Sequence, residues 1–489
     1  MHPDNLRLRL AVFLVAIAAA AFCVGTKGPN LDEFWTVIFT DPRVGLGQAW
    51  FWWSADTPHP PGYYALVRLW LTPFGASVTA VRGLNLAIWT VLAGYWLFAP
   101  ANGSAMRRFC LSFVLAVSVT FFTLERLAEA RAYFPAFALV CVLLVELRRL
   151  DTPGRAGGAL ARIAAATIAI ALFDYPIFCA AAGVLLVAGG ALLLAGRRAD
   201  ARGIGAALGA GALVMAAGMV NALGYEHVVV PYDITTATYA KFAAEVVVAG
   251  LAGNLALSWL AARGLPAGLP ELTLRTYDFR IVALVAAVGA VFGFLVLNLA
   301  LHAILSRHLI PITALVCAAV TAWLPERAWS RAGIAAMLIA FAGSALLVSW
   351  RIAAMDNLHR FADRLAAAQR HCPAYTVIPV DMFALGKPAS SVNGETRALA
   401  SRFGQLAIAH EAGITLAPAE QRRVDPRCGG AVWFVPGYPA PGATAASLLD
   451  VLKFPLTPAQ RAGSRLLLEN TVLVLEVPGA ALTPRQGPL

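Results

Sequence analysis

Residues 175–195 read YPIFCAAAGVLLVAGGALLLA, an apolar run that contains no charged side chain. A helix of about 20 such residues is long enough to cross the hydrocarbon core of a bilayer. Similar runs recur along the first 352 positions. The pattern predicts an α-helical polytopic membrane protein with about 11 transmembrane helices. We place the spans near residues 8–25, 77–98, 109–123, 132–147, 159–173, 175–195, 203–222, 241–261, 281–303, 309–324 and 332–350.

The composition supports this fold class. Of the 489 residues, 59% are hydrophobic and 13% are charged, and the mean hydropathy is +0.70. Water-soluble domains carry about 25% charged residues. An ordinary soluble enzyme, a disordered chain and a fibrous protein are therefore excluded. The net charge of +11 is compatible with a nucleic-acid partner, but its distribution follows membrane topology, so we expect no nucleic acid.

The basic residues predict the orientation of the chain in the membrane. With the N-terminus inside, the inward loops hold 16 of the 25 Lys and Arg residues before position 353. Cytoplasmic loops are enriched in such residues, so we expect a cytoplasmic N-terminus. The apolar segment 7–25 lacks a convincing small-residue cleavage site, and we interpret it as a retained first helix rather than a signal peptide.

After the last span the composition changes, and residues 353–489 are expected outside the cytoplasm. This tail carries 13 basic and 10 acidic residues. Its patterns predict a small C-terminal extracytoplasmic α/β domain, with an amphipathic helix at 356–370 and strands at 375–380, 431–435 and within 466–477. The transmembrane domain accordingly covers residues 1–352.

The seven cysteines fall into two groups. In an oxidising compartment, Cys372 and Cys428 of the tail are a plausible disulfide. The other five lie in apolar runs without metal-ligand spacing, and we interpret them as small core hydrophobes: Cys23, Cys110, Cys141, Cys179 and Cys317.

The first outward loop, residues 26–76, contains the acidic pair Asp32 and Glu33 followed by a Trp-rich stretch. Trp-rich amphipathic helices lie at the membrane interface, so the pair is expected at the membrane surface. It is either a set of helix-start charges or a general base with a pKa raised by desolvation. Further along the loop come Asp56, the turn His59-Pro60-Pro61 that is expected to start a helix, and Tyr63 and Tyr64.

Two more polar clusters occupy outward ends of spans. Residues 125–133, ERLAEARAY, place four charges at the mouth of an apolar hairpin, where charges are costly unless paired or functional. Either they form an intramolecular Glu–Arg latch, or Arg131 binds a phosphate, which a guanidinium matches with two hydrogen bonds. Arg307 and His308 precede the tenth span; an arginine there either snorkels to the interface or binds an anion. Asp174 lies between two spans on the same side.

Four of these motifs, in this order, give the chain a family resemblance. LDE (31–33), DTPHPPGYY (56–64), EARAY (129–133) and SRHLIP (306–311) resemble motifs of the GT-C glycosyltransferase superfamily. The resemblance is to its bacterial members related to protein O-mannosyltransferases and lipid A aminoarabinose transferases. It covers about residues 1–350, and the tail has no recognisable match.

The resemblance implies a function. Such enzymes transfer a sugar from a polyprenyl-phosphate donor to an acceptor at the outer, periplasmic face of the bacterial cytoplasmic membrane. The acceptor could be lipid A or core lipopolysaccharide, another envelope glycan, or a protein. No cofactor is implied, and relatives usually work without a metal, although the residue pattern leaves a divalent metal open.

The resemblance also assigns roles to residues. Asp32 would be the catalytic base, and Glu33 beside it would be an assisting carboxylate or a contact to the acceptor. The donor phosphate would be bound by Arg131, Arg307 and His308, with Glu129 orienting Arg131. The substrate pocket would contain Asp56, His59, Tyr63, Tyr64, Glu129, Tyr133 and Asp174.

Three positions depart from the family pattern. His308 stands where Tyr is usual, and Gly62 replaces a common Leu. Residues 173–175, FDY, stand where relatives often have a His-containing turn.

Two other functions remain open at this point. Secondary transporters are built from internal repeats with broken helices and charges near mid-membrane. Here no repeat is visible, and the charges gather at the outer interface. A third reading is a non-catalytic protein that binds a lipid carrier or scaffolds an envelope complex.

Overall fold

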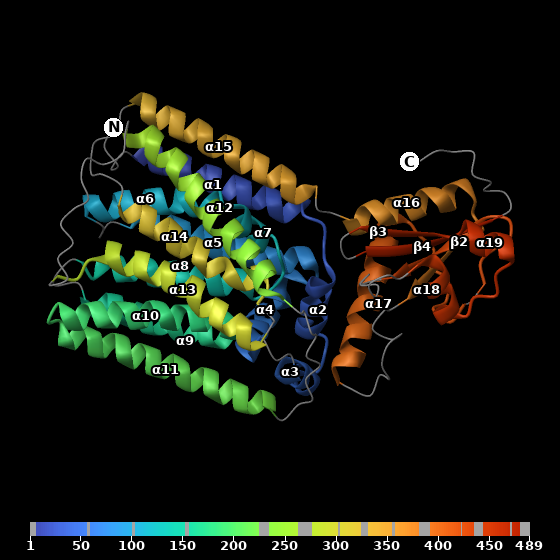
Figure 1. Ribbon diagram of the computed structural model, residues 1–489, viewed down its shortest axis with the longest axis horizontal. Coiled ribbons are helices and arrows are strands. Elements are labelled where there is room, and N and C mark those ends of the chain that lie inside the picture. Colours follow the sequence, from blue (N-terminus) through green and yellow to red (C-terminus); the bar gives the residue numbers. More distant parts are fainter. Residues whose placement is uncertain are drawn as a thin grey trace. The chain divides into compact units, whose positions relative to one another are not determined.

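The computed structural model divides the chain into two compact units (Figure 1). The first unit contains Met1–Thr26 and Phe39–Ile352, and the second contains Lys27–Ile38 and Ala353–Leu489. The structure describes residues 6–55, 59–99, 103–151, 156–223, 234–262, 276–301, 304–323, 331–354, 357–380, 392–421, 423–434, 444–469 and 472–479.

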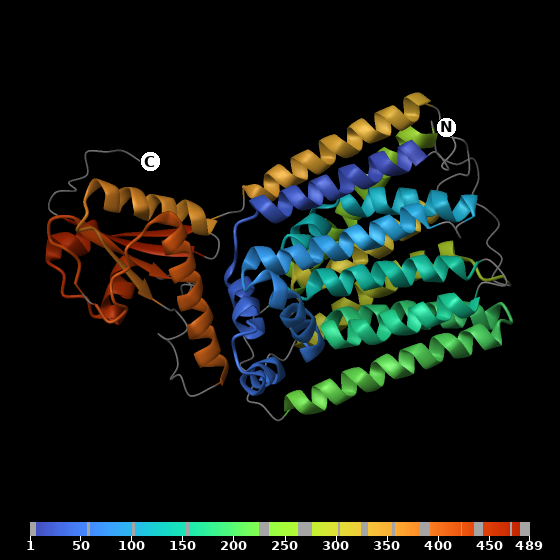
Figure 2. The same ribbon diagram turned by 180° about the vertical axis from the view of Figure 1, so that it is seen from behind.

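The first unit is a bundle of helices that lie side by side in both views (Figure 1, Figure 2). Each of the eleven predicted spans coincides with a helix. The third span continues past a bend of 76° into α7 (Phe121–Leu127). The span helices are α1 (Leu6–Thr26), α5 (Val78–Phe98), α6 (Ser104–Ser118), α8 (Tyr133–Arg149), α9 (Ala156–Phe173), α10 (Tyr175–Leu194), α11 (Arg198–Leu223), α12 (Thr236–Ala262), α13 (Phe279–Leu301), α14 (Ile310–Ala322) and α15 (Arg331–Ala353).

Length and hydropathy support a multi-pass membrane protein. Among the described residues, five helices are long and apolar enough to cross a membrane, or up to seven if each bent helix pair is one span. The shorter helices α8 and α14 are buried along almost their whole length. A helix that is hydrophobic all round belongs in a protein interior. These two helices therefore lie inside the bundle.

A helix at the edge of the bundle, such as α1, has one apolar face that is buried and another that is exposed. On α1 the side chains of Val12 and Ala16 are buried, whereas Leu10 and Leu14 are exposed. Exposed apolar side chains on such a helix are suited to contact with lipid. The same distinction corrects one prediction, because Cys179 of α10 is exposed and is not a core residue. An apolar run does not by itself separate a lipid-facing position from a buried one.

Three short helices follow the first span: α2 (Leu31–Thr40), α3 (Leu46–Ala55) and α4 (Pro61–Phe74). As expected, α4 starts at the His-Pro-Pro turn, with Pro60 at its N-cap. On α3 the side chains of Trp50 and Phe51 are exposed, as an interfacial helix requires. Trp53 is instead buried, and its indole nitrogen donates to the carbonyl oxygen of Phe39 over 2.8 Å.

The second unit contains a four-stranded sheet in the order β1-β2-β4-β3. Strand β1 (Thr376–Val380) runs parallel to β2 (Gly429–Phe434), and the pairs β2–β4 and β3–β4 are antiparallel. Strand β3 spans Arg465–Glu469 and β4 spans Val472–Pro478. This confirms a small α/β unit with strands at the expected places. Its helices are α16 (Asn357–His371), α17 (Val392–Ala412), α18 (Ala445–Leu452) and α19 (Pro458–Gly463).

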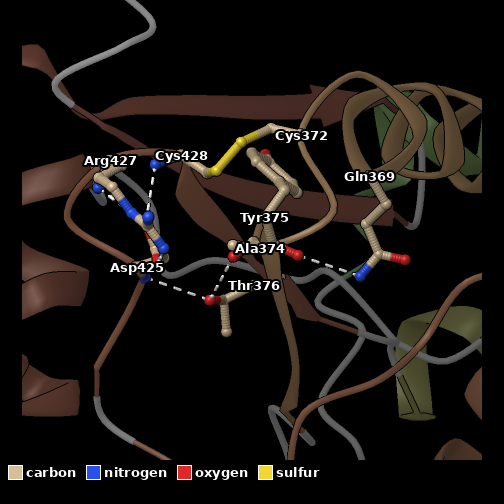
Figure 3. The surroundings of a disulfide bond; sticks show 8 residues. All are labelled: Gln369, Cys372, Ala374, Tyr375, Thr376, Asp425, Arg427 and Cys428. Carbon is tan, nitrogen blue, oxygen red and sulfur yellow. Dashed lines mark hydrogen bonds and ion pairs between the residues drawn. A yellow bond between two sulfur atoms is a disulfide. The ribbon is translucent and has the colours of Figure 1, made fainter.

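A disulfide joins Cys372, which follows α16, to Cys428, which precedes β2 (Figure 3). The two Cα atoms lie 6.0 Å apart, a normal separation for such a bridge. The Asp425 carboxylate accepts from the backbone N–H of Cys428 over 3.0 Å, and Thr376 Oγ1 accepts from the N–H of Asp425 over 3.2 Å. The predicted disulfide is confirmed, and it ties the first helix of the tail to the sheet.

Candidate functional site

Segments far apart in the sequence converge in the first unit. They are the turn before α4, the start of α8, the turn between α9 and α10, and the 3-10 helix η1 (Ser306–Leu309). These segments carry His59, Tyr133, Asp174 and Arg307, and direct contacts link them. Side chains from several of the polar clusters singled out in the sequence are therefore in contact within this unit.

His59 lies at the centre of these contacts. Its Nδ1 atom is 3.4 Å from Oδ2 of Asp174, and its Nε2 atom is 3.3 Å from the hydroxyl oxygen of Tyr133. All three side chains are almost completely buried. The other carboxylate oxygen of Asp174 caps α10 by accepting from the backbone N–H of Ile177 over 2.9 Å. The cap fixes the carboxyl group, so that Oδ2 faces the imidazole.

Burial sets the protonation of this pair. Burial raises the pKa of Asp174 to about 7. The hydrogen bond from Ile177 and the charges of Arg131 and Arg307 lower this pKa, but by less. Burial also holds the pKa of His59 well below its usual value, and the positive charges of Arg131 and Arg307 act in the same direction. Each group thus favours its neutral form. Both arginines are close enough to act on the pair.

Tyr133 connects the pair to η1. The Arg307 guanidinium carbon lies 5.4 Å from the centre of the Tyr133 ring, a cation–π distance. The ring of His308 is 6.0 Å from the same tyrosine. His308 Nδ1 accepts from the backbone N–H of Leu305 over 3.2 Å. In the neutral form its proton is therefore on Nε2, which makes this atom a hydrogen-bond donor.

A second group of charges surrounds Arg126 on α7. Its guanidinium pairs with Glu125 over 2.8 Å and with Glu129 in a second ion pair. The amide of Asn85 donates to the carbonyl oxygens of Leu127 and Glu129, which anchors the loop. The Glu–Arg latch considered above is therefore present.

The latch involves a residue that the sequence analysis did not assign to the site. Glu129 was expected to orient Arg131, and the ion pair described here joins it to Arg126. In addition, the Arg131 backbone N–H donates to the Glu129 carbonyl oxygen over 2.8 Å. The spacing of Arg126 and Glu129, three residues apart, was the available signal.

The sum of these charges is positive. Arg126, Arg131 and Arg307 contribute three positive charges, and Glu125 and Glu129 contribute two negative ones. The balance is +1 with a neutral Asp174. An excess of positive charge on buried and half-buried guanidinium groups is suited to an anion such as a phosphate.

The acidic pair Asp32 and Glu33 lies in the first turn of α2, in the second unit. Glu33 Oε2 accepts from the backbone N–H of Asn30 over 2.9 Å, and Asn30 Oδ1 accepts from the N–H of Glu33 over 3.1 Å. This reciprocal arrangement is a capping box. Glu33 therefore serves as a helix-start charge, which was one of the two interpretations of the pair.

The side chains of Tyr63 and Tyr64 pack against other aromatic rings. Both side chains are buried, and their ring centres are 5.4 Å apart. Tyr64 stacks on Trp53 at 6.4 Å, and Tyr63 contacts Phe173 edge-on at 6.4 Å. The two tyrosines thus pack α4 against α3 and the end of α9. Asp56, the remaining pocket candidate, lies outside the described residues.

No group of three or more His, Cys, Asp or Glu side chains suited to a metal ion occurs within the part of the chain that the structure describes.

Comparison with known proteins bears on the fold. No protein-family model and no curated protein sequence matches the chain. Among solved structures, the chain is similar to the crystal structure of ArnT from Cupriavidus metallidurans bound to undecaprenyl phosphate. The TM-score is 0.52 at 12% sequence identity, over 97% of this chain and 99% of the other. The chain therefore has a GT-C-like fold, as its motifs predicted.

Proposed function

We propose that this chain is an integral-membrane glycosyltransferase that moves a sugar from a polyprenyl-phosphate donor to an acceptor of the cell envelope. The observation that carries the proposal is the net-positive cluster around the buried Arg131 and the half-buried Arg307. The fold likeness supports it, since the similar ArnT structure holds undecaprenyl phosphate. A lipid phosphate is an anion that such a cluster can bind.

The proposed chemistry needs few groups. The polyprenyl phosphate leaves as a stable anion, so the reaction requires positive charge near the phosphate but no strong acid. In this proposal Arg131 and Arg307 supply that charge. His308 Nε2 adds a neutral donor in place of the tyrosine hydroxyl usual at this position.

A base must take a proton from the acceptor hydroxyl or amine, and we assign this role to Asp32. Glu33 holds the start of α2 through its capping box with Asn30. In the transition state positive charge develops at the sugar carbon. Attack on the face opposite to the leaving phosphate inverts that carbon. The proposal includes no cofactor and no metal.

The proposed location is the cytoplasmic membrane of a bacterium, with the N-terminus inside and the α/β unit in the periplasm. The disulfide between Cys372 and Cys428 supports this, because such bonds persist in oxidising compartments. The acceptor is then lipid A or core lipopolysaccharide, another envelope glycan, or a secreted protein.

Binding of undecaprenyl phosphate to the purified full-length protein tests the proposal. Loss of a hydrogen bond to a charged group costs about 1.5–3 kcal/mol, so Arg131→Ala and Arg307→Ala should each weaken binding roughly 10- to 150-fold. Arg351→Ala is the matched control, since Arg351 is an exposed arginine of the same unit that lies over the Phe121 ring. Equal binding by all four proteins would rule out the proposed phosphate site.

A further inference from the structure

Two of the positions that depart from the family pattern lie close together in the structure. A Cβ atom on Gly62 would lie 2.7 Å from the carbonyl oxygen of Leu172 and 2.8 Å from its Cβ. The start of α4 is therefore pressed against the end of α9, two residues before Asp174. Only glycine allows this approach without moving backbone. The same approach brings His59, three residues before Gly62, to the Asp174 carboxyl group.

From Asp174 a continuous series of contacts leads to Arg307. The Asp174 carboxyl group is fixed by its cap on α10 and faces His59 Nδ1 at 3.4 Å. The other imidazole nitrogen faces the Tyr133 hydroxyl at 3.3 Å, and the Tyr133 ring lies under the Arg307 guanidinium at 5.4 Å. Asp174, His59 and Tyr133 are each at most 2% exposed.

We infer that Asp174, His59 and Tyr133 form a buried positioning relay that holds the Arg307 guanidinium at the phosphate site, and that Gly62 permits the relay to form. The inference rests on the proposed function, in which Arg307 contacts the donor phosphate. In this account none of the three residues touches the phosphate. They act through Arg307.

The physical reason lies in the arginine side chain. Arginine has many rotamers, and a guanidinium held in place loses less freedom when it binds an anion. The Tyr133 ring can hold it only if the ring is itself held. Its buried hydroxyl needs a hydrogen-bond partner, and His59 is that partner. The other imidazole nitrogen faces the buried Asp174 carboxyl group at 3.4 Å, a close contact without a hydrogen bond.

Donor binding by a set of variants tests the relay. Tyr133→Phe keeps the ring and loses the hydroxyl, and Asp174→Asn keeps a capping side chain but changes the group that faces His59. Tyr133→Phe should raise the Kd for undecaprenyl phosphate about 2- to 10-fold, as expected for one neutral hydrogen bond, and Asp174→Asn should raise it as well. Tyr133→Leu also removes the ring and should weaken binding further. When the donor is saturating, kcat should change little, because the relay affects binding of the donor.

The decisive comparison is the double variant Tyr133→Leu/Arg307→Ala. If Tyr133 acts through Arg307, the double variant should bind the donor as Arg307→Ala does, since coupled positions are not additive. Fully additive losses would overturn the relay. If Arg307→Ala alone leaves binding unchanged, the proposed phosphate contact fails first, and the two failures remain distinguishable.

Tyr95→Phe is the matched control. Tyr95 also lies under an arginine, Arg149, at 5.4 Å, and its hydroxyl accepts from that side chain over 3.2 Å. This pair is outside the site, so Tyr95→Phe should bind the donor as the natural protein does. Thermal stability in detergent checks that each variant is folded. If Gly62→Ala folds, it should weaken binding as Asp174→Asn does, and unchanged binding by both would contradict the relay.

Discussion

The latch around Arg126 gives a prediction with a magnitude that follows from burial. Only 11% of the Arg126 side chain is exposed, and it is paired with Glu125 and with the 2%-exposed Glu129. Arg126→Met keeps most of the volume but removes the charge. Both carboxylates then remain in a poorly solvated place without this partner.

Breaking a buried pair by removing one member costs about 3–5 kcal/mol, because the remaining charge is uncompensated. Replacing all the members by neutral groups of similar size is often close to neutral. We therefore expect Arg126→Met to destabilise the protein strongly. The triple variant Glu125→Gln/Arg126→Met/Glu129→Gln should recover most of the loss.

Thermal unfolding of the purified protein in detergent measures both effects. The control is Arg461→Met in the second unit, where the Arg461 and Asp450 side chains are 39% and 64% exposed. An exposed pair of this kind contributes about 0–1 kcal/mol. If Arg126→Met unfolds no earlier than Arg461→Met, or if the triple variant is no more stable than the single one, the reasoning about the latch is wrong.

Two further predictions concern pH and the disulfide. Burial raises the pKa of Asp174 to about 7 from 3.8, so the stability that its protonated form contributes is complete below 3.8 and lost as the pH rises through about 7. The melting temperature of the natural protein should therefore fall relative to that of Asp174→Asn across this range, and a constant difference would contradict the shift. Cys372 and Cys428 are 56 residues apart in the sequence. For a loop of this length, the chain entropy of the unfolded state predicts that loss of the disulfide lowers the free energy of unfolding by about 4 kcal/mol. Cys372→Ser/Cys428→Ser should destabilise the second unit, as measured by limited proteolysis, and alkylation of both native thiols without reduction would show that the bond is absent.

The helices of the membrane unit were predictable because length and hydropathy determine them locally. The charged residues at their ends predict which loops share one face of the membrane. The sequence did not distinguish helices inside the bundle, such as α14, from those at its edge. That distinction depends on which neighbours cover a helix, and Cys179 was misassigned for the same reason.

The residue types of the site were predictable, but their pairing was not. His59 and Asp174 are in different loops, and the close packing at Gly62 accompanies their approach. Glu129 has two arginines within reach in the sequence, and the structure shows its ion pair with Arg126 at the end of α7. The spacing of Asn30 and Glu33 matches a capping box, which agrees with the interpretation of the acidic pair as helix-start charges.

Sugar transfer by the purified full-length protein tests the central claim most directly. Labelled polyprenyl-phosphate sugars and an envelope extract provide donor and acceptor for the natural protein, Asp32→Asn and the control Asp41→Asn, whose carboxylate pairs with Arg43 on the surface. Loss of a general base lowers a rate about 10²- to 10⁴-fold. We predict that Asp32→Asn binds the donor normally and transfers at least about a hundredfold more slowly, while Asp41→Asn transfers normally. Transfer by Asp32→Asn at the natural rate would contradict the assignment of the base, and donor binding without any transfer by the natural protein would contradict the proposed activity.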